Sequence, residues 1–115
     1  DFGLHLLGHW VRERGDFTLP EAVAELTSKQ AQAYGIQQRG SLRTGYFADL
    51  IMFDPNTIGR GKKERVFDLP TGASRLVRSS NGLSGIWVNG VRVADESGVF
   101  ESEQRPGHVL RSFDA

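Results

Sequence analysis

The sequence predicts an α+β fold in which two or three short helices are followed by a small antiparallel β-sheet. Three observations predict it. Apolar residues recur with helical spacing in the first third, the apolar run Leu50–Phe53 lies between turn residues, and apolar strands flank Asn89-Gly90. Helical periodicity lies before Gly40 and strand periodicity after it. The stretch from Gly40 to Pro55 therefore separates the two kinds of structure.

The first predicted helix covers residues 4–14 and is amphipathic. Its apolar arc contains Leu4, Leu6, Leu7, Trp10 and Val11, and its polar side contains His5, His9, Arg12 and Glu13. Gly15 is a suitable residue to end it in a left-handed conformation.

Two shorter helices are predicted next. Thr18 and Glu21 form a capping-box pattern, which predicts a helix from Leu19 to about Leu26 with a buried stripe of Ala22, Val23 and Leu26. Thr27 or Ser28 can cap a further helix that runs through Tyr34 and stops at Gly35.

The run Leu50–Phe53 is too short for a helix and suits a strand covered on both faces, which Asp54-Pro55 would end. Residues 56–65 are polar and predict an exposed loop. A short strand at Val66-Phe67, a turn over residues 68–72 and a strand at Leu76-Val77 complete this region.

Asn89-Gly90 predicts a two-residue hairpin turn of type I′. With that turn Val88 faces Val91, Trp87 faces Arg92 and Ile86 faces Val93, so that Arg92 can lie over Trp87. Residues 98–100 are expected to return as one more short strand, and residues 105–107 to form a turn.

Composition excludes several classes of function. Fourteen basic and fourteen acidic side chains balance, so the net charge gives no support for a nucleic-acid or membrane partner. The chain has no cysteine, which excludes disulfides and thiol catalysis and fits a reducing, cytoplasmic location. No apolar run approaches the length of about 20 residues that a membrane helix needs, and we expect no signal peptide.

Two groups of residues have the pattern of a binding site, but each has a simpler interpretation. His5, His9 and Glu13 are four apart and share a helix face, a spacing seen in zinc sites. However, Leu6 follows the first histidine where the metalloprotease motif has glutamate, and the favoured interpretation is a polar face with a His9–Glu13 contact. Cations between Arg60 and Arg65 could bind a polyanion, although Glu64 interrupts them and the simpler interpretation is a solvated loop.

Four segments together resemble the amidohydrolase superfamily, closest to the N-acyl-D-amino-acid deacylase (D-aminoacylase) group. They are Leu6-Leu7-Gly8-His9-Trp10-Val11-Arg12-Glu13, residues 42–54 within Gly-Ser-Leu-Arg-Thr-Gly-Tyr-Phe-Ala-Asp-Leu-Ile-Met-Phe-Asp, Trp87-Val88-Asn89-Gly90-Val91 and Arg105-Pro106-Gly107-His108-Val109-Leu110-Arg111. Their order and spacing carry the resemblance, which runs from about Leu6 to Arg111.

The resemblance implies that this chain is the carboxyl-terminal portion of a metal-dependent hydrolase of non-peptide C–N bonds that uses zinc and acts on small N-acyl amino acids. Residues 1–39 would end the catalytic barrel and pack against it, and residues 40–115 would form part of a composite β-sandwich. The partners implied are the barrel and amino-terminal strands of the same polypeptide, with self-association where they are missing. The competing hypothesis is a self-contained binding or interaction module.

The resemblance assigns no catalytic, cofactor-binding or metal-binding residue to this chain. The family binds metal through His-x-His and further ligands, and no His-x-His occurs here. Asp1 is the one candidate for the aspartate at the last barrel strand, because residues 1–5 match the Asp-x-Gly-x-His portion of that motif. However, Leu6–Glu13 follows at once, whereas the family usually inserts a further stretch there. We therefore expect scaffold and no catalysis from this chain alone.

Overall fold

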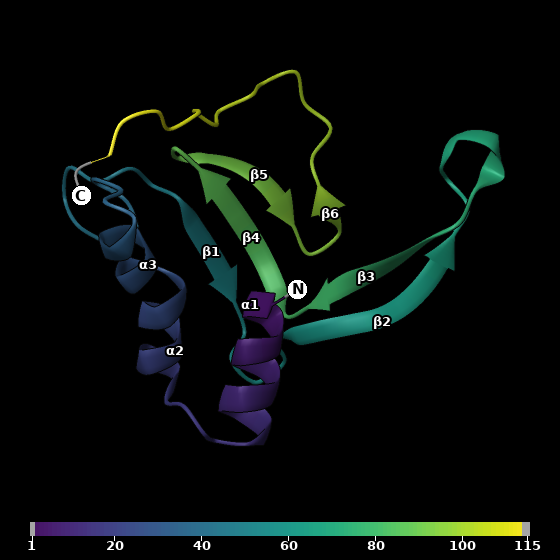
Figure 1. Cartoon of the computed structure of the whole chain (residues 1–115), viewed down its shortest axis with the longest axis horizontal. Coiled ribbons are helices and arrows are strands. Elements are labelled where there is room, and N and C mark those ends of the chain that lie inside the picture. Colours follow the sequence, from purple (N-terminus) through teal and green to yellow (C-terminus); the bar gives the residue numbers. More distant parts are fainter. Residues whose placement is uncertain (1, 114–115) are drawn as a thin grey trace.

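A helical layer, a four-stranded sheet and a two-stranded ribbon make up the computed structural model, which describes residues 2–113 (Figure 1). The helices are α1 (Phe2–His5), the π-helix η1 (Leu6–Glu13), α2 (Leu19–Leu26), α3 (Ser28–Ala33) and the 3₁₀ helix η2 (Pro70–Gly72). The strands are β1 (Leu50–Phe53), β2 (Gly59–Val66), β3 (Arg75–Asn81), β4 (Leu83–Val88), β5 (Val91–Asp95) and β6 (Gly98–Val99). This confirms the predicted α+β fold. Within these residues no helix is long and apolar enough to cross a bilayer.

The first helix forms as predicted, although most of it has π rather than α geometry. Its apolar arc supplies the buried Leu6 and Leu7, which join Ala22 and Ile58 in the core. The helix ends before Gly15, whose φ of 70° confirms the left-handed position. Part of the apolar side that the resemblance assigns to a barrel contact is therefore buried within this chain.

The two short helices have the predicted positions. Thr18 Oγ1 accepts a hydrogen bond from the Glu21 backbone amide at 3.3 Å, and α2 begins at Leu19, directly after Thr18. Thr27 does not cap α3 through its side chain, because its hydroxyl donates to the Val23 carbonyl oxygen at 2.6 Å. Ala22 is buried as expected. Val23 is exposed, so its assignment to the buried stripe is wrong.

The main sheet is antiparallel, in the order β1-β4-β5-β6, with β1 and β6 at its edges. The bounds of β1 confirm the predicted strand. The expectation that both faces are covered is wrong: Ile51 and Met52, which point to opposite faces, are both half-exposed. The described residues therefore do not fully cover either face of this edge strand.

The hairpin turn is confirmed, with φ of 48° at Asn89 and 81° at Gly90. Val88 pairs with Val91 and Trp87 with Arg92, whose guanidinium lies 5.1 Å from the centre of the indole ring.

Beyond those two pairs the predicted register is wrong, because Ile86 pairs with Ala94 instead of Val93. A bulge inserts one residue at Val93, and such a bulge changes which side chains face the core. As a result the small Ala94 is the buried residue of β5.

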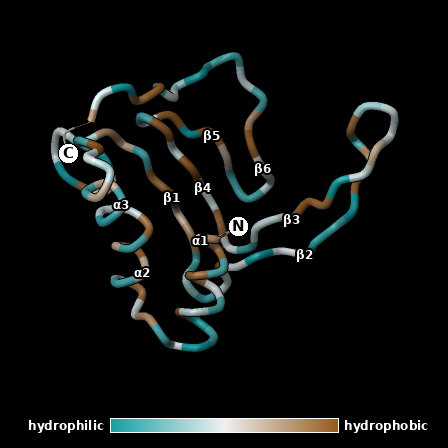
Figure 2. Tube along the Cα trace, in the orientation of Figure 1, coloured by the Kyte–Doolittle hydropathy of each residue, from teal (hydrophilic) through white to brown (hydrophobic). Residues whose placement is uncertain are grey.

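The loop expected over residues 56–65 is wrong, because β2 occupies residues 59–66 and pairs with β3. The sequence does not predict this strand because β2 is mostly hydrophilic (Figure 2) and so lacks the apolar pattern of a strand. Its hydrogen bonds are made with β3, a segment further along the chain. Of the predicted strand residues, Val66, Leu76 and Val77 belong to this ribbon, whereas Phe67 lies just beyond the end of β2. The helix η2 lies in the turn of the ribbon.

The ribbon projects away from the helices and the main sheet (Figure 1). Its projection agrees with a Cα radius of gyration of 16.2 Å, where a compact domain of this length would have about 13 Å. The helices α2 and α3 lie on the other side of the molecule, beside β1.

Candidate functional site

A polar cleft of about 340 Å³ lies where η1 meets the root of the ribbon. Its walls come from α1 and η1 on one side and from β2 and β3 on the other. The charged or titratable side chains lining it are His5, His9, Arg12, Glu13, Arg60 and Arg78. The polar side of the first helix therefore faces basic residues that the sequence alone does not place near it.

Within the cleft the two histidines stack face to face. The ring centres of His5 and His9 are 4.9 Å apart and the planes differ by 4°. His9 Nδ1 lies 2.8 Å from Glu13 Oε2, which confirms the predicted His9–Glu13 contact. This hydrogen bond lowers the pKa of the Glu13 carboxyl. Partial burial, together with the charges of Arg60, His9 and Arg78, lowers the pKa of His5.

These residues do not fit a zinc ion. A zinc site needs three or four nitrogen, sulfur or oxygen ligands that converge on one point, whereas stacked parallel rings do not converge and Glu13 already holds one nitrogen of His9. Across residues 2–113 no group of three or more histidines and carboxylates is arranged to hold a metal ion. The arginines at the cleft would also repel a cation.

The wall of the cleft is fixed by close backbone packing. A side chain at Gly8 would place its Cβ 2.6 Å from the Ile58 carbonyl oxygen, so only glycine lets the helix approach this closely. Arg12 then donates from Nη2 to the same oxygen at 3.1 Å. The helix η1 is thereby held against Ile58, the residue before β2. This contact places η1 beside the start of the ribbon, and the cleft lies between them.

A second polar cluster is centred on Asp49, in the segment that carries the family resemblance. Asp49 Oδ1 accepts a hydrogen bond from the backbone amide of Asn89 at 2.9 Å, and Oδ2 pairs with the Arg39 guanidinium. Beside it, the Gly90 amide donates to the Ala48 carbonyl oxygen at 2.9 Å. One carboxylate thus joins the end of the helical part, the start of β1 and the hairpin turn.

The carboxyl-terminal tail joins the same cluster. Asn89 Nδ2 donates to the Pro106 carbonyl oxygen at 2.6 Å. Residues 105–107 have no regular structure, so the turn predicted there is wrong. Burial raises the pKa of Asp49, but the bonds from Asn89 and Arg39 outweigh it and the net effect lowers that pKa.

The structure brings some of the candidate site residues together. His5, His9 and Glu13 come together in the cleft, and Arg60 joins them from β2. Asp1 lies outside the described residues. Sequence reasoning missed the role of Asp49, and no local pattern could have revealed it, because its partner Asn89 is forty positions away.

The model of the Amidohydrolase family matches residues 2–94, which include the first helix, Asp49 with its partners Arg39 and Asn89, and the hairpin. The chain belongs to the amidohydrolase family. This confirms the resemblance seen in the four sequence segments.

Relatives within the amidohydrolases are deacylases of D-amino-acid derivatives. The chain is 36% identical over 111 residues to N-acyl-D-aspartate deacylase of Alcaligenes xylosoxydans xylosoxydans, covering 96% of this chain and 20% of that protein. It is 36% identical over 105 residues to D-aminoacylase of the same organism, covering 91% of this chain and 19% of that protein. The chain therefore spans about a fifth of the length of these relatives.

Solved structures agree in fold. The chain superposes on N-acyl-D-glutamate deacylase from Bordetella bronchiseptica, solved with zinc and a phosphonate inhibitor, with a TM-score of 0.74 and 35% identity. The match covers 95% of this chain and 20% of that one. Helices, sheet and ribbon thus form one unit that this amidohydrolase shares with a much longer enzyme.

Proposed function

We propose that this chain is the carboxyl-terminal part of a zinc-dependent amidohydrolase that removes the acyl group from an N-acyl-D-amino acid. The observation that carries the proposal is the structural match over 95% of the chain to a fifth of a deacylase solved with zinc, at 35% identity. In this proposal zinc is held by residues outside the described part of this chain, since the cleft residues do not fit it.

The role of this chain is then structural. Residues 1–39 pack against the catalytic barrel and residues 40–115 contribute strands to a β-sandwich. Support comes from large apolar side chains that the chain leaves exposed on its helices and on β1, namely Val23, Ile51 and Met52. Exposed apolar surface on an edge strand favours coverage by another part of the polypeptide. Where that part is missing, we infer that these surfaces drive self-association.

No residue of the chain is assigned to catalysis in this proposal, and a cytoplasmic location remains a prediction from the lack of cysteine. Asp1 is the exception to be tested, because it matches the family's last-strand aspartate by pattern alone. Aspartate in such a position would act as the base for the attacking water.

The experiment compares the 115-residue chain with the longer polypeptide encoded by the uninterrupted reading frame around it. Zinc content and release of acetate from N-acetyl-D-aspartate, N-acetyl-D-glutamate and N-acetyl-D-leucine are measured for both. The longer protein should bind zinc and hydrolyse at least one substrate, while the chain alone should do neither. Stoichiometric zinc with turnover in the chain alone would overturn the scaffold role, and inactivity of the longer protein on all three would overturn the deacylase assignment.

A further inference from the structure

The chain contains the dipeptide Asn-Gly twice, at Asn81-Gly82 and at Asn89-Gly90. Asparagine before glycine is prone to spontaneous deamidation, because glycine has no side chain to shield its amide nitrogen from the asparagine side chain. The first dipeptide joins β3 of the ribbon to β4 of the main sheet, and the second is the hairpin turn between β4 and β5. Since the two dipeptides are chemically identical, a difference in their reactivity must come from the fold.

The fold holds Asn89 in an unreactive arrangement. The Gly90 amide would have to lose its proton and attack, but it donates that proton to the Ala48 carbonyl oxygen at 2.9 Å. Asn89 Nδ2, the leaving group, donates to the Pro106 carbonyl oxygen at 2.6 Å. Oδ1 of the same side chain is buried and has no hydrogen-bond donor within residues 2–113. Attack would place negative charge on this oxygen, and burial without a donor makes such charge costly.

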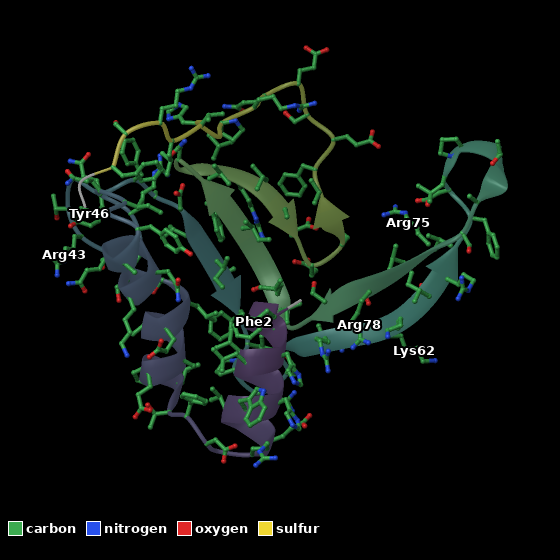
Figure 3. The ribbon with its side chains drawn as sticks, viewed as in Figure 1. Phe2, Arg43, Tyr46, Lys62, Arg75 and Arg78 are labelled. Carbon is green, nitrogen blue, oxygen red and sulfur yellow. The ribbon has the colours of Figure 1, made fainter. Side chains whose placement is uncertain are left out.

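Asn81 lacks these restraints in the part of the chain that the structure describes. Its side chain is exposed, and no hydrogen bond to that side chain or from the Gly82 amide occurs among residues 2–113. Asn81 lines the polar cleft together with Arg60 and Arg78, and Arg78 lies on the inner half of the ribbon in Figure 3. Positive charge nearby favours the deprotonated Gly82 nitrogen that the reaction needs.

We propose that Asn81 is a deamidation site of the folded protein and that Asn89 is protected. The Gly82 amide nitrogen loses its proton to hydroxide and bonds to Asn81 Cγ, and the Cγ–Nδ2 bond breaks. The leaving nitrogen takes a proton from water and departs as ammonia, which leaves a succinimide. Water then opens the succinimide at either of its carbonyl carbons and gives aspartate or isoaspartate. The reaction consumes water and releases ammonia, and it is independent of the proposed hydrolase activity.

The reaction alters the junction between the ribbon and the main sheet. Either product adds a negative charge to the polar cleft. Isoaspartate also routes the main chain through the former side chain and so lengthens it directly before Gly82. The junction has no room for this change, because even a Cβ at Gly82 would lie 2.5 Å from the Ile58 nitrogen. Ile58 is a core residue, so isoaspartate at this position should lower the urea concentration at which the chain unfolds.

The test follows deamidation of the folded chain and of the chain in guanidinium chloride at the same mildly alkaline pH. Chymotryptic cleavage after Trp87 separates the two asparagines, and mass spectrometry of the peptides measures the conversion of each amide to the acid. In the folded chain Asn81 should react about tenfold faster than Asn89 or more, because Asn89 reacts only when its contacts open. In guanidinium chloride the two rates should converge. Comparable rates in the folded chain would overturn the proposal, as would an unreactive Asn81 over the time in which the unfolded chain reacts.

Two matched variants assign the reaction to its residue. Asn81→Gln should almost abolish ammonia release from the folded chain, because glutamine reaches the Gly82 nitrogen only through a larger and slower-forming ring. Asn89→Gln is the control and should leave the rate at Asn81 unchanged. Deletion of residues 104–115 removes the Pro106 acceptor and should raise the rate at Asn89, whereas an unchanged rate would overturn the protection assigned to this contact. Circular dichroism of every variant confirms folding.

Discussion

The main sheet and the β2–β3 ribbon are both antiparallel, but they are held in different ways. The sheet is tied by contacts that are distant in sequence: Asp49 binds the Asn89 amide and Arg39, and Asn89 binds the Pro106 carbonyl oxygen. The polar side-chain contacts identified near the turn of the ribbon, Arg75 with Asp68 and Arg65 with Ser74, stay within the ribbon. The sheet is therefore stabilised by contacts across the whole chain, whereas the turn end of the ribbon is held by contacts within the ribbon itself.

Ile58, at the junction of the two regions, gives the largest expected effect. It is 1% exposed and lies in the core beneath η1. Ile58→Ala should lower the free energy of unfolding by about 3 kcal/mol, because it leaves a cavity where helix, sheet and ribbon meet. Ile51→Ala makes the same change at a half-exposed site and should cost under about 1 kcal/mol. Urea denaturation measures both, and equal losses would show that the junction is not the core.

Asp49→Ala tests the long-range contacts of Asp49 with Asn89 and Arg39. It removes the acceptor of the Asn89 backbone amide and of the Arg39 guanidinium. The free energy of unfolding should fall by about 1 to 2 kcal/mol after allowance for solvent screening. Hydrogen exchange should rise at the hairpin amides and in the tail near Pro106, with little change in the ribbon. Asp95→Ala is the control, because the Asp95 carboxylate accepts hydrogen bonds from the amide and hydroxyl of Ser97, two positions away in the β5–β6 turn. A uniform rise across the ribbon would contradict the separation of the two regions.

Acid should weaken the Asp49 contacts by less than the Asp49→Ala substitution does. The pKa of Asp49 is lower in the folded state than in the unfolded chain, so its stabilisation is complete above the ordinary aspartate range near 4 and is lost as the pH falls through the folded pKa. The difference in unfolding free energy between wild type and Asp49→Ala should therefore shrink from pH 6 towards about pH 3. Denaturant titrations at a series of pH values measure it. A constant difference would show that the carboxylate charge is not involved.

The smallest expected effect lies in the ribbon and has the opposite sign. Lys63→Glu replaces a like-charge pair with Arg78 by an opposite-charge pair, and should stabilise the ribbon by about 0.5 kcal/mol. Slower hydrogen exchange of β2 and β3 amides than in the wild type, measured at low salt so that the charges are not screened, checks this. Lys62→Glu is the neighbouring control, because Lys62 lies in the bulge of β2 and has no residue of β3 paired with it. Faster exchange in the Lys63 variant would mean that Lys63 and Arg78 do not repel each other.

Elements with local signals can be predicted from the order of the residues alone. The bounds of β1 and α2, the left-handed position of Gly15 and the type I′ turn at Asn89-Gly90 follow from capping, glycine conformation and short-range periodicity. Family membership was equally accessible, because four short segments in order are a property of the chain and not of its folding.

Tertiary structure decided what depends on partners far along the chain. The polar run of β2 became a strand because β3 supplied its hydrogen bonds, and the bulge at Val93 placed Ala94 in the core. The cleft exists because Gly8 lets the helix reach Ile58, which brings Arg60 and Arg78 to His5 and His9. Pairing and packing energies of this kind are set by neighbours in space, and for that reason a local pattern of residues does not contain them.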